Sequence, residues 1–217
     1  MSKPLLIGLC LLLATATYGQ EKPKAPFFSG VDLMFDYGKL VGLIVDYESK
    51  FEGGAGLVFA DRLRLVGEYG QAELTPERAF RNVLNFAVEG TYIRFGADYL
   101  IPLQNDQHTF YIGVRYALST FDDRGEVQIL SDVHNDFVET FNRQDQDADW
   151  IELVLGTKTE VRPNLYLGLR FRYRRLGQFD NNNSIPVYAI PGYGRTADSS
   201  VPAGNLYIQY RLATRRN

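Results

Sequence analysis

The chain has 217 residues, 13% of them aromatic and 20 of them glycine, a composition that suits one domain built from many short strands and turns. Its formal net charge of −3 is too small to indicate a nucleic-acid partner or an acidic ligand. No apolar run beyond the N-terminal region approaches the roughly 20 residues of a membrane helix, whereas barrel strands carry a weaker hydropathy signal and are not excluded.

Residues 1–20 are predicted to be a cleaved signal peptide that directs export. Lys3 supplies the positive end and residues 5–13 form the apolar core. The small and turn-prone residues that follow offer cleavage after Ala16 or before Gln20. An uncleaved anchor helix is the alternative, and the short apolar core disfavours it.

The only cysteine, Cys10, lies inside this leader. Leu9 precedes it where a lipoprotein needs a small residue, and apolar residues continue past it, so lipid attachment is not expected. The mature chain then has neither a disulfide nor cysteine chemistry.

A short polar linker at 21–26 is expected to precede a single β-barrel domain at 27–213, followed by a C-terminal tail at 214–217. Within the domain, apolar residues alternate with polar or small ones, and a period of two indicates β-strands. The alternation is clearest on both sides of Arg162-Pro163-Asn164, which predicts a hairpin. Strands are predicted at about 30–37, 51–59, 63–72, 89–100, 109–121, 150–161, 165–174 and 203–212.

The connections between these strands fall into two alternating classes. Short ones are predicted at 61–62, 102–107 and 162–164, and long ones at 38–50, 74–87, 122–148 and 178–200. Outer-membrane barrels combine short periplasmic turns with longer external loops and an even strand number. We therefore predict an all-β, antiparallel up-and-down outer-membrane barrel of about eight strands. For 38–50, loop, helix and strand all stay open, whereas 122–149 lacks a sustained period and is predicted as a loop.

Glycine and arginine indicate which face of the strands points inward. Gly96, Gly113, Gly156 and Gly168 lie on the charged face, where small residues would leave room for large side chains in an eight-stranded lumen. An arginine facing lipid near the midplane would cost about 2–4 kcal/mol. We therefore predict that the charged face lines the lumen, where buried charges need partners. The seven acids and seven bases of this face are Asp32, Asp36, Glu52, Glu68, Asp98, Glu152 and Glu160 with Arg64, Arg94, Arg115, Lys158, Arg170, Arg172 and Arg174.

Four strand segments and one loop motif carry a family resemblance. The strand segments are 110–116 (FYIGVRY), 150–156 (WIELVLG), 165–173 (LYLGLRFRY) and 205–212 (NLYIQYRL). The loop motif, which is the most specific piece, is Pro191, Gly192, Tyr193, Gly194 and Arg195. Together these segments resemble an uncharacterised family of small predicted outer-membrane barrels from Bacteroidetes-type bacteria, which implies the fold and the location but no catalytic residue. This chain departs from many such barrels in that Ala213–Asn217 follow Leu212, where an aromatic residue commonly ends the chain.

The supply of catalytic groups is poor. His108 lies at a predicted periplasmic turn and His134 in an external loop, so the two histidines are expected on opposite sides of the membrane. A lipid-modifying enzyme needs a histidine paired with a serine or carboxylate near one rim, and only His134 with Ser131 or a loop acid offers this. We therefore predict a protein that is not an enzyme, with no catalytic residue.

The spacing of Asp145, Asp147 and Asp149 hints at a hard cation, but no glycine or distal glutamate completes a calcium loop. These acids could contact divalent ions that bridge lipid phosphates, although a solvated acidic loop is preferred. No metal and no cofactor is therefore predicted. The apolar loop 185–193 is interpreted as a lid over the barrel mouth, with an exposed partner-binding patch as the alternative.

The sequence thus predicts a monomeric outer-membrane barrel with a plugged, ion-paired lumen and an envelope or surface-interaction role. Its expected partners are outer-membrane lipid and, during biogenesis, the outer-membrane assembly machinery, with no nucleic acid and no known protein partner. One alternative is a narrow channel for small solutes or anions that uses the arginine row. Another is a soluble, lipocalin-like periplasmic barrel, in which the two faces would be reversed.

Overall fold

The computed structural model describes residues 26–36, 48–76, 83–103, 107–129, 137–177, 179, 186–196 and 199–213. The predicted signal peptide with Cys10, nearly all of the linker, residues 38–47 of the first connection, His134 with Ser131, and the C-terminal tail lie outside these residues. No helix in the described ranges is long and apolar enough to cross a membrane.

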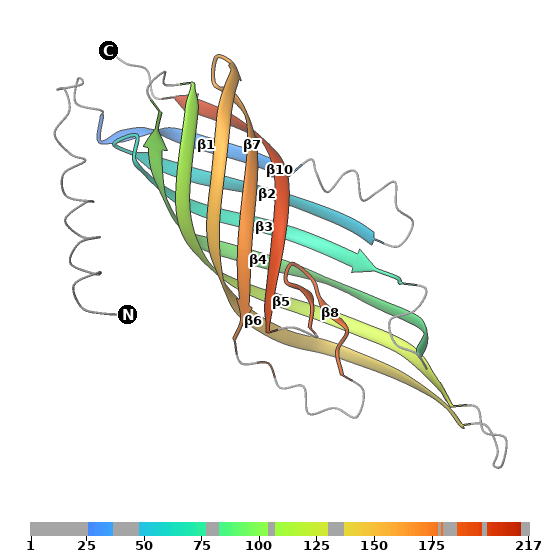
Figure 1. Ribbon diagram of the computed structural model, residues 1–217. Coiled ribbons are helices and arrows are strands. Elements are labelled where there is room, and N and C mark those ends of the chain that lie inside the picture. The colour runs from blue at the N-terminus through green and yellow to red at the C-terminus, as the bar shows by residue number, and fades with distance from the viewer. Residues whose placement is uncertain are drawn as a thin grey trace, which may run out of the picture.

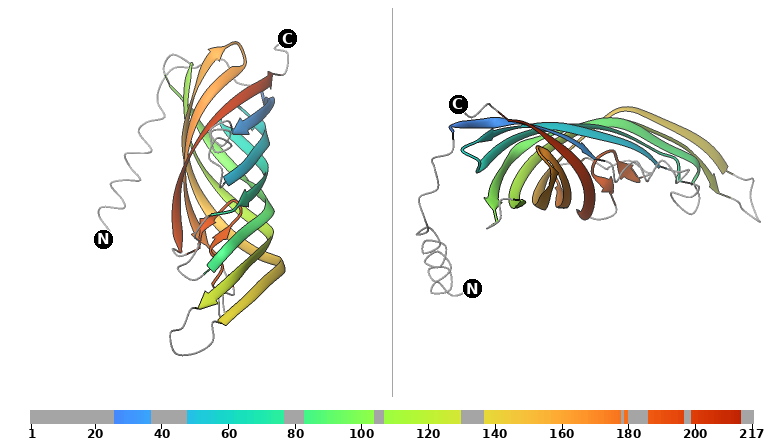
Figure 2. Two further views of the ribbon diagram at one scale, coloured as in Figure 1. Left: turned by 90° about the vertical axis from the view of Figure 1, so that its right-hand side faces the viewer. Right: turned by 90° about the horizontal axis from the view of Figure 1, so that it is seen from above.

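Eight antiparallel strands of the described chain form a closed barrel (Figures 1 and 2). Their order around the barrel is β1-β10-β7-β6-β5-β4-β3-β2, so that sequence neighbours pair and the first and last strands close the ring. The predicted fold class is confirmed. The barrel strands are β1 (Phe28–Asp36), β2 (Glu48–Phe59), β3 (Leu63–Leu74), β4 (Val83–Pro102), β5 (His108–Ile129), β6 (Phe137–Arg162), β7 (Leu165–Leu176) and β10 (Ser200–Ala213).

Two of the short turns contain residues in the left-handed backbone region. Ala60 and Asp61, between β2 and β3, have φ values of 50° and 53°, and Asn164, between β6 and β7, has a φ of 67°. Tight hairpins need such left-handed residues, and Asn and Asp adopt them more readily than most others. Both turns lie at the same end of the barrel as the start of β1 and the end of β10 (Figure 1), which is called the turn end below.

The barrel has apolar side chains outside and charged ones inside. On β7, Leu167, Leu169 and Phe171 are exposed, whereas Arg170 and Arg172 between them are buried. The same alternation holds on β3, where the burial pattern switches at every residue from Leu63 to Glu73. The predicted assignment of faces is confirmed, and it is the reverse of the arrangement expected for a soluble lipocalin-like barrel.

Parts of the connections that were predicted to be long loops are strands in the structure. β5 continues to Ile129 and β6 begins at Phe137, so most of the predicted loop 122–149 is a paired hairpin. β4 begins at Val83, inside the predicted loop 74–87, and β2 begins at Glu48. Irregular pairing between Leu84 and Ala87 and between Phe121 and Asp123 shifts the alternation of side chains. A search for an unbroken period of two therefore misses these strands.

The lengthened strands carry the sheet well past the rest of the barrel at the end opposite the turn end (Figures 1 and 2). The protruding part is called the extension below, and it consists of residues 83–87 of β4, 121–129 of β5 and 137–148 of β6. Near its base, a small hairpin of β8 (Ala189–Ile190) and β9 (Gly194–Arg195) lies within the predicted loop 178–200.

Candidate functional site

Near the turn end, ion pairs inside the barrel gather around Asp32 and Asp98. Arg64 lies between them, with Nη2 2.7 Å from Asp98 Oδ2 and Nη1 3.3 Å from Asp32 Oδ2. Asp32 also faces Arg211, whose Nε lies 2.6 Å from its Oδ1, and Lys158, whose Nζ lies 3.5 Å from its Oδ2. These residues come from β1, β3, β4, β6 and β10, so the cluster ties opposite walls of the barrel together.

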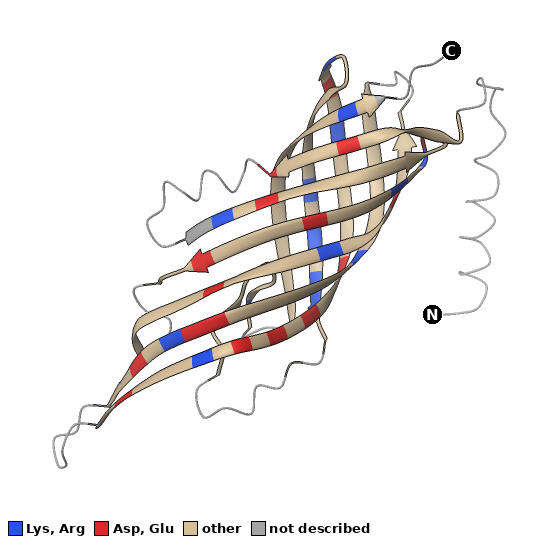
Figure 3. Cartoon of the chain, turned by 180° about the vertical axis from the view of Figure 1, so that it is seen from behind, with Lys and Arg blue, Asp and Glu red and all other residues tan. Residues whose placement is uncertain are grey.

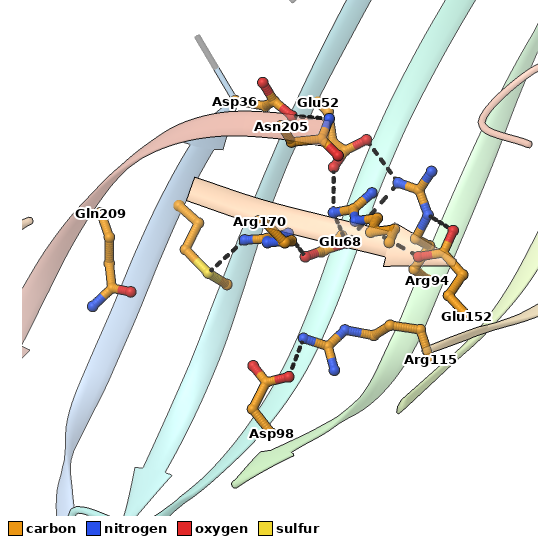
Figure 4. Close-up of polar contacts among 12 residues, drawn as sticks. Asp36, Glu52, Glu68, Arg94, Asp98, Arg115, Glu152, Arg170, Asn205 and Gln209 are labelled. Atoms are coloured by element: carbon orange, nitrogen blue, oxygen red, sulfur yellow. Dashed lines mark hydrogen bonds and ion pairs between the residues drawn. The ribbon is translucent and has the colours of Figure 1, made fainter. Parts of the chain in front are cut away.

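A second cluster lies further from the turns, around Glu52, Glu68 and Glu152 (Figure 4). Arg94 Nη1 lies 2.7 Å from Glu52 Oε2, and Arg94 Nε lies 2.8 Å from Glu152 Oε1. Arg172 Nη2 lies 2.8 Å from both Glu52 Oε1 and Glu68 Oε2. Arginine suits this position because its planar fork can serve two carboxylates at once.

The remaining members of the interior extend these two clusters. Arg170 pairs with Glu68, and Arg174 Nε lies 3.4 Å from Glu152 Oε1. Arg115 Nη2 lies 2.7 Å from Asp98 Oδ1. Arg115 is buried and thus belongs to the same charged interior.

The structure buries eight of the nine singled-out network residues inside the barrel, where each contacts an opposite charge: Asp98, Arg94, Arg115, Glu152, Lys158, Arg170, Arg172 and Arg174. Glu160 differs, because it is half-buried near the β6–β7 turn and accepts a hydrogen bond of 2.8 Å from the Asn164 N–H. Arg211 was missed, although it continues the charged face of β10 two residues after Gln209. Asn205 was missed as well, and its Nδ2 donates to Asp36 at 2.6 Å.

Glycines on the inner face allow tyrosine rings to lie against the strands. A Cβ atom on Gly156 would lie 2.2 Å from Tyr111 Cζ, and one on Gly168 would lie 2.2 Å from Tyr207 Cζ. The same two rings face arginines, with Arg64 Cζ 4.8 Å from the Tyr111 centroid and Arg170 Cζ 4.5 Å from that of Tyr207. Gly156 and Gly168 thus leave room for tyrosine rings inside the barrel, as the sequence predicted for large side chains.

The hairpin of residues 186–196 folds into the mouth of the barrel and is called the lid below. Gly192 and Tyr193 turn their backbone carbonyls onto the arginines beneath, accepting from Arg94 Nη2 at 2.8 Å and Arg174 Nη1 at 2.6 Å. The Tyr193 ring also packs edge-on against Trp150, with centroids 5.7 Å apart. Gly192 has a φ of 82° and lies directly over the Tyr92 ring, so a side chain at this position would be strained and would clash with the ring.

The lid completes an apolar cluster at this end of the barrel. In the loop motif, Pro191, Gly192 and Tyr193 are buried, Gly194 is half-buried and Arg195 is exposed, so the arrangement fits a lid better than an exposed patch. The buried members of the cluster are Ala72, Val83, Phe86, Val88, Tyr92, Ala117, Phe121, Ala148, Trp150, Val187, Ala189, Ile190 and Tyr193.

A small hollow of about 10 Å³ lies among the charged side chains of the interior, bordered by Met34, Glu52, Glu68, Arg170 and Tyr207, among others. This volume is about what one water molecule needs.

The other candidate residues have ordinary local roles. His108 Nδ1 lies 2.9 Å from Thr159 Oγ1 near the turn end, which occupies this nitrogen with a hydroxyl of the neighbouring strand. Asp147 accepts from Thr120 Oγ1 at 2.8 Å, and the Asp145 N–H donates to Asp122 Oδ1 at 2.8 Å. Within the described ranges, no three His, Cys, Asp or Glu side chains gather as metal ligands.

The extension is acidic, as the red segments along its strands show in Figure 3. Two arginines lie among the acids. Arg143 pairs with Asp123, and Arg124 Nη1 lies 3.6 Å from Glu89 Oε1. The charged residues of the extension are Asp122, Asp123, Glu126, Glu139, Asp145 and Asp147 with Arg124 and Arg143.

The chain belongs to the family described as domain of unknown function (DUF6048), whose profile matches residues 13–214. This confirms the resemblance to an uncharacterised barrel family, while an origin in Bacteroidetes-type bacteria stays a prediction. No curated protein sequence matches the chain.

Several solved barrels are similar in structure. Neisserial surface protein A matches with a TM-score of 0.44 and 16% identity, covering 88% of this chain and 100% of its own. The N-terminal β-barrel domain of Pseudomonas aeruginosa OprF matches at 0.42 and 11%, covering 87% and 100%. Ail, the attachment invasion locus protein of Yersinia pestis, matches at 0.43 and 8%, covering 86% and 98%. The likeness is one of barrel architecture alone.

Proposed function

We propose that this protein is a small outer-membrane barrel with a plugged lumen that serves the envelope as a structural or surface-interaction protein. In this proposal it is neither an enzyme nor an open channel. The turn end faces the periplasm, and the lid and the extension lie on the outer side of the membrane.

The outer surface supports the membrane location. Exposed apolar side chains occur on every barrel strand, among them Leu33, Leu65, Phe95, Val114, Leu153 and Leu169. A soluble protein rarely exposes a continuous apolar surface of this extent. Lipid contact removes that difficulty, and a closed barrel leaves no unpaired strand edge within the bilayer.

The single observation that best supports the proposal of a plugged lumen is the set of contacts made by Arg94. Its guanidinium reaches Glu52 on β2, Glu152 on β6 and the Gly192 carbonyl of the lid, while its own backbone belongs to β4. An ion that passed along the barrel axis would have to separate these contacts. Breaking buried, well-formed ion pairs costs several kcal/mol each, which disfavours conduction.

An anion channel is the runner-up, because Arg170, Arg172 and Arg174 form a row along β7. Each of them, however, faces a carboxylate or the lid: Arg170 faces Glu68, Arg172 faces Glu52 and Glu68, and Arg174 faces Glu152 and the Tyr193 carbonyl. The row is thus neutralised from within the chain, which favours the plug over an anion site.

Two measurements on purified protein test the proposal. On detergent gels the folded protein should migrate differently from the heated protein, as a detergent-resistant barrel does, and fractionation should place it with the outer membrane. Solubility without detergent would contradict the membrane location. In planar bilayers, the wild-type protein should give no reproducible conductance steps, and anion-selective steps would contradict the plugged lumen.

A further inference from the structure

One edge of the extension carries backbone groups that no described strand pairs with. β7 pairs with β6 from Trp150 onward, and the last backbone contact on that side among the described residues is the Gly177 N–H donating to the Asp149 carbonyl at 2.9 Å. From Phe137 to Ala148, β6 pairs with β5 on one side only, as far as the described residues show. This stretch of β6 is called the open edge below.

The direction of the backbone groups follows from the contact at Asp149. Backbone N–H and C=O groups along an antiparallel strand point to its two sides in alternation, so residues two apart point the same way. The pairing is regular between Leu118–Asp149 and Thr120–Asp147. Asp147 therefore turns its N–H and C=O to the same side as the Asp149 carbonyl, which is the side where no described strand pairs with β6.

Charge indicates what could bind there. Both arginines of the extension are held by acids of the same chain, Arg143 by Asp123 and Arg124 by Glu89. Glu139, Asp145 and Asp147 on β6 itself are exposed. An approaching strand would run beside these carboxylates, so a basic strand is attracted and an acidic one repelled.

We propose that the open edge of β6 binds an extended, lysine- or arginine-rich segment of another protein as an added strand. Backbone hydrogen bonds to the edge supply the pairing, and the acids of β6 select basic side chains. The proposal rests on the proposed function only in placing the extension outside the cell. Binding itself can be measured on detergent-solubilised protein whether or not that orientation is correct.

Three synthetic eight-residue peptides probe the edge in fluorescence anisotropy titrations of the full chain in detergent. The first alternates lysine with threonine, the second is the same peptide N-methylated at every residue, and the third alternates glutamate with threonine. We expect the lysine peptide to bind and the other two not to bind. Equal binding of the N-methylated peptide would show charge attraction without strand addition, and would overturn the proposal. Absence of binding by the lysine peptide would overturn it as well.

A pair of variants at one position separates the backbone from the side chain. Asp147→Pro removes an N–H of the open edge and leaves the pairing with β5 intact, because proline is tolerated at strand edges. Asp147→Ala removes the same carboxylate but keeps the N–H. We expect the proline variant to bind the lysine peptide about tenfold more weakly than the alanine variant, since it lacks one more hydrogen bond.

Hydrogen exchange locates the peptide and does not depend on how well the proline variant folds. With the wild-type protein, adding the lysine peptide should slow amide exchange within 137–148 and leave the β2–β3 turn unchanged. Slowing elsewhere, with none in 137–148, would place the peptide at another site and overturn the proposal.

Discussion

Within the barrel, β6 turns Glu152 and Lys158 inward, where both are buried, and Leu153 outward. On the N-terminal side of Trp150, in the extension, the same strand exposes Glu139, Asp145 and Asp147, and most of its other side chains are at least partly exposed. One continuous strand thus buries its charges in one region and exposes them in the other. The comparison teaches that the surroundings of the strand, rather than its backbone geometry, decide where a charged or apolar residue is stable.

Removing a buried acid should give the largest difference between the two regions. Glu152→Ala leaves Arg94 without one carboxylate and Arg174 without its ion-pair partner, and loss of a buried partner costs about 3–5 kcal/mol. Glu139→Ala on the extension removes an exposed acid and should stay within about 0.5 kcal/mol. Urea unfolding of protein refolded into lipid vesicles measures both, and equal losses would break the comparison.

Placing an arginine on the outer face should give the next largest difference. Leu153 and Val138 lie on β6 and are similarly exposed, at 45% and 52%. Leu153→Arg should destabilise the protein by about 2–4 kcal/mol, because its charge would face lipid. Val138→Arg should have little effect, because its charge would face water. If Leu153→Arg were as stable as the wild type in vesicles, the membrane location of the barrel would be wrong.

Filling the interior should give the smallest of the three effects. Gly156→Ala would place a methyl group 2.2 Å from Tyr111 Cζ, and such overpacking typically costs about 1–3 kcal/mol. Gly67→Ala adds the same methyl group where no heavy atom lies within 4 Å. Urea unfolding measures both variants, and Gly156→Ala on the packed inner face should unfold at a lower urea concentration than Gly67→Ala on the open outer face. If Gly156→Ala were as stable as the wild type, a tightly filled lumen would be contradicted.

Alternation of apolar and charged residues was enough to predict the barrel, its strand number and the face on which Arg170 and Arg172 lie. It did not reveal the extension, because irregular pairing between Leu84 and Ala87 and between Phe121 and Asp123 breaks the period of two. Which base meets which acid was also beyond reach. Arg94 and Glu52 are brought together across the lumen by barrel closure, and the lid contact with the Gly192 carbonyl depends on that closure as well.

The seam between the first and last barrel strands has a consequence for biogenesis. Asp32 on β1 faces its direct partner Arg211 on β10, and Asp36 on β1 accepts from Asn205 on β10. Because these contacts join the first barrel strand to the last, they can form only after β10 has been made and the ring has closed. We therefore expect Asp32 and Asp36 to stay hydrated until that closure, and to lose their water when the seam forms.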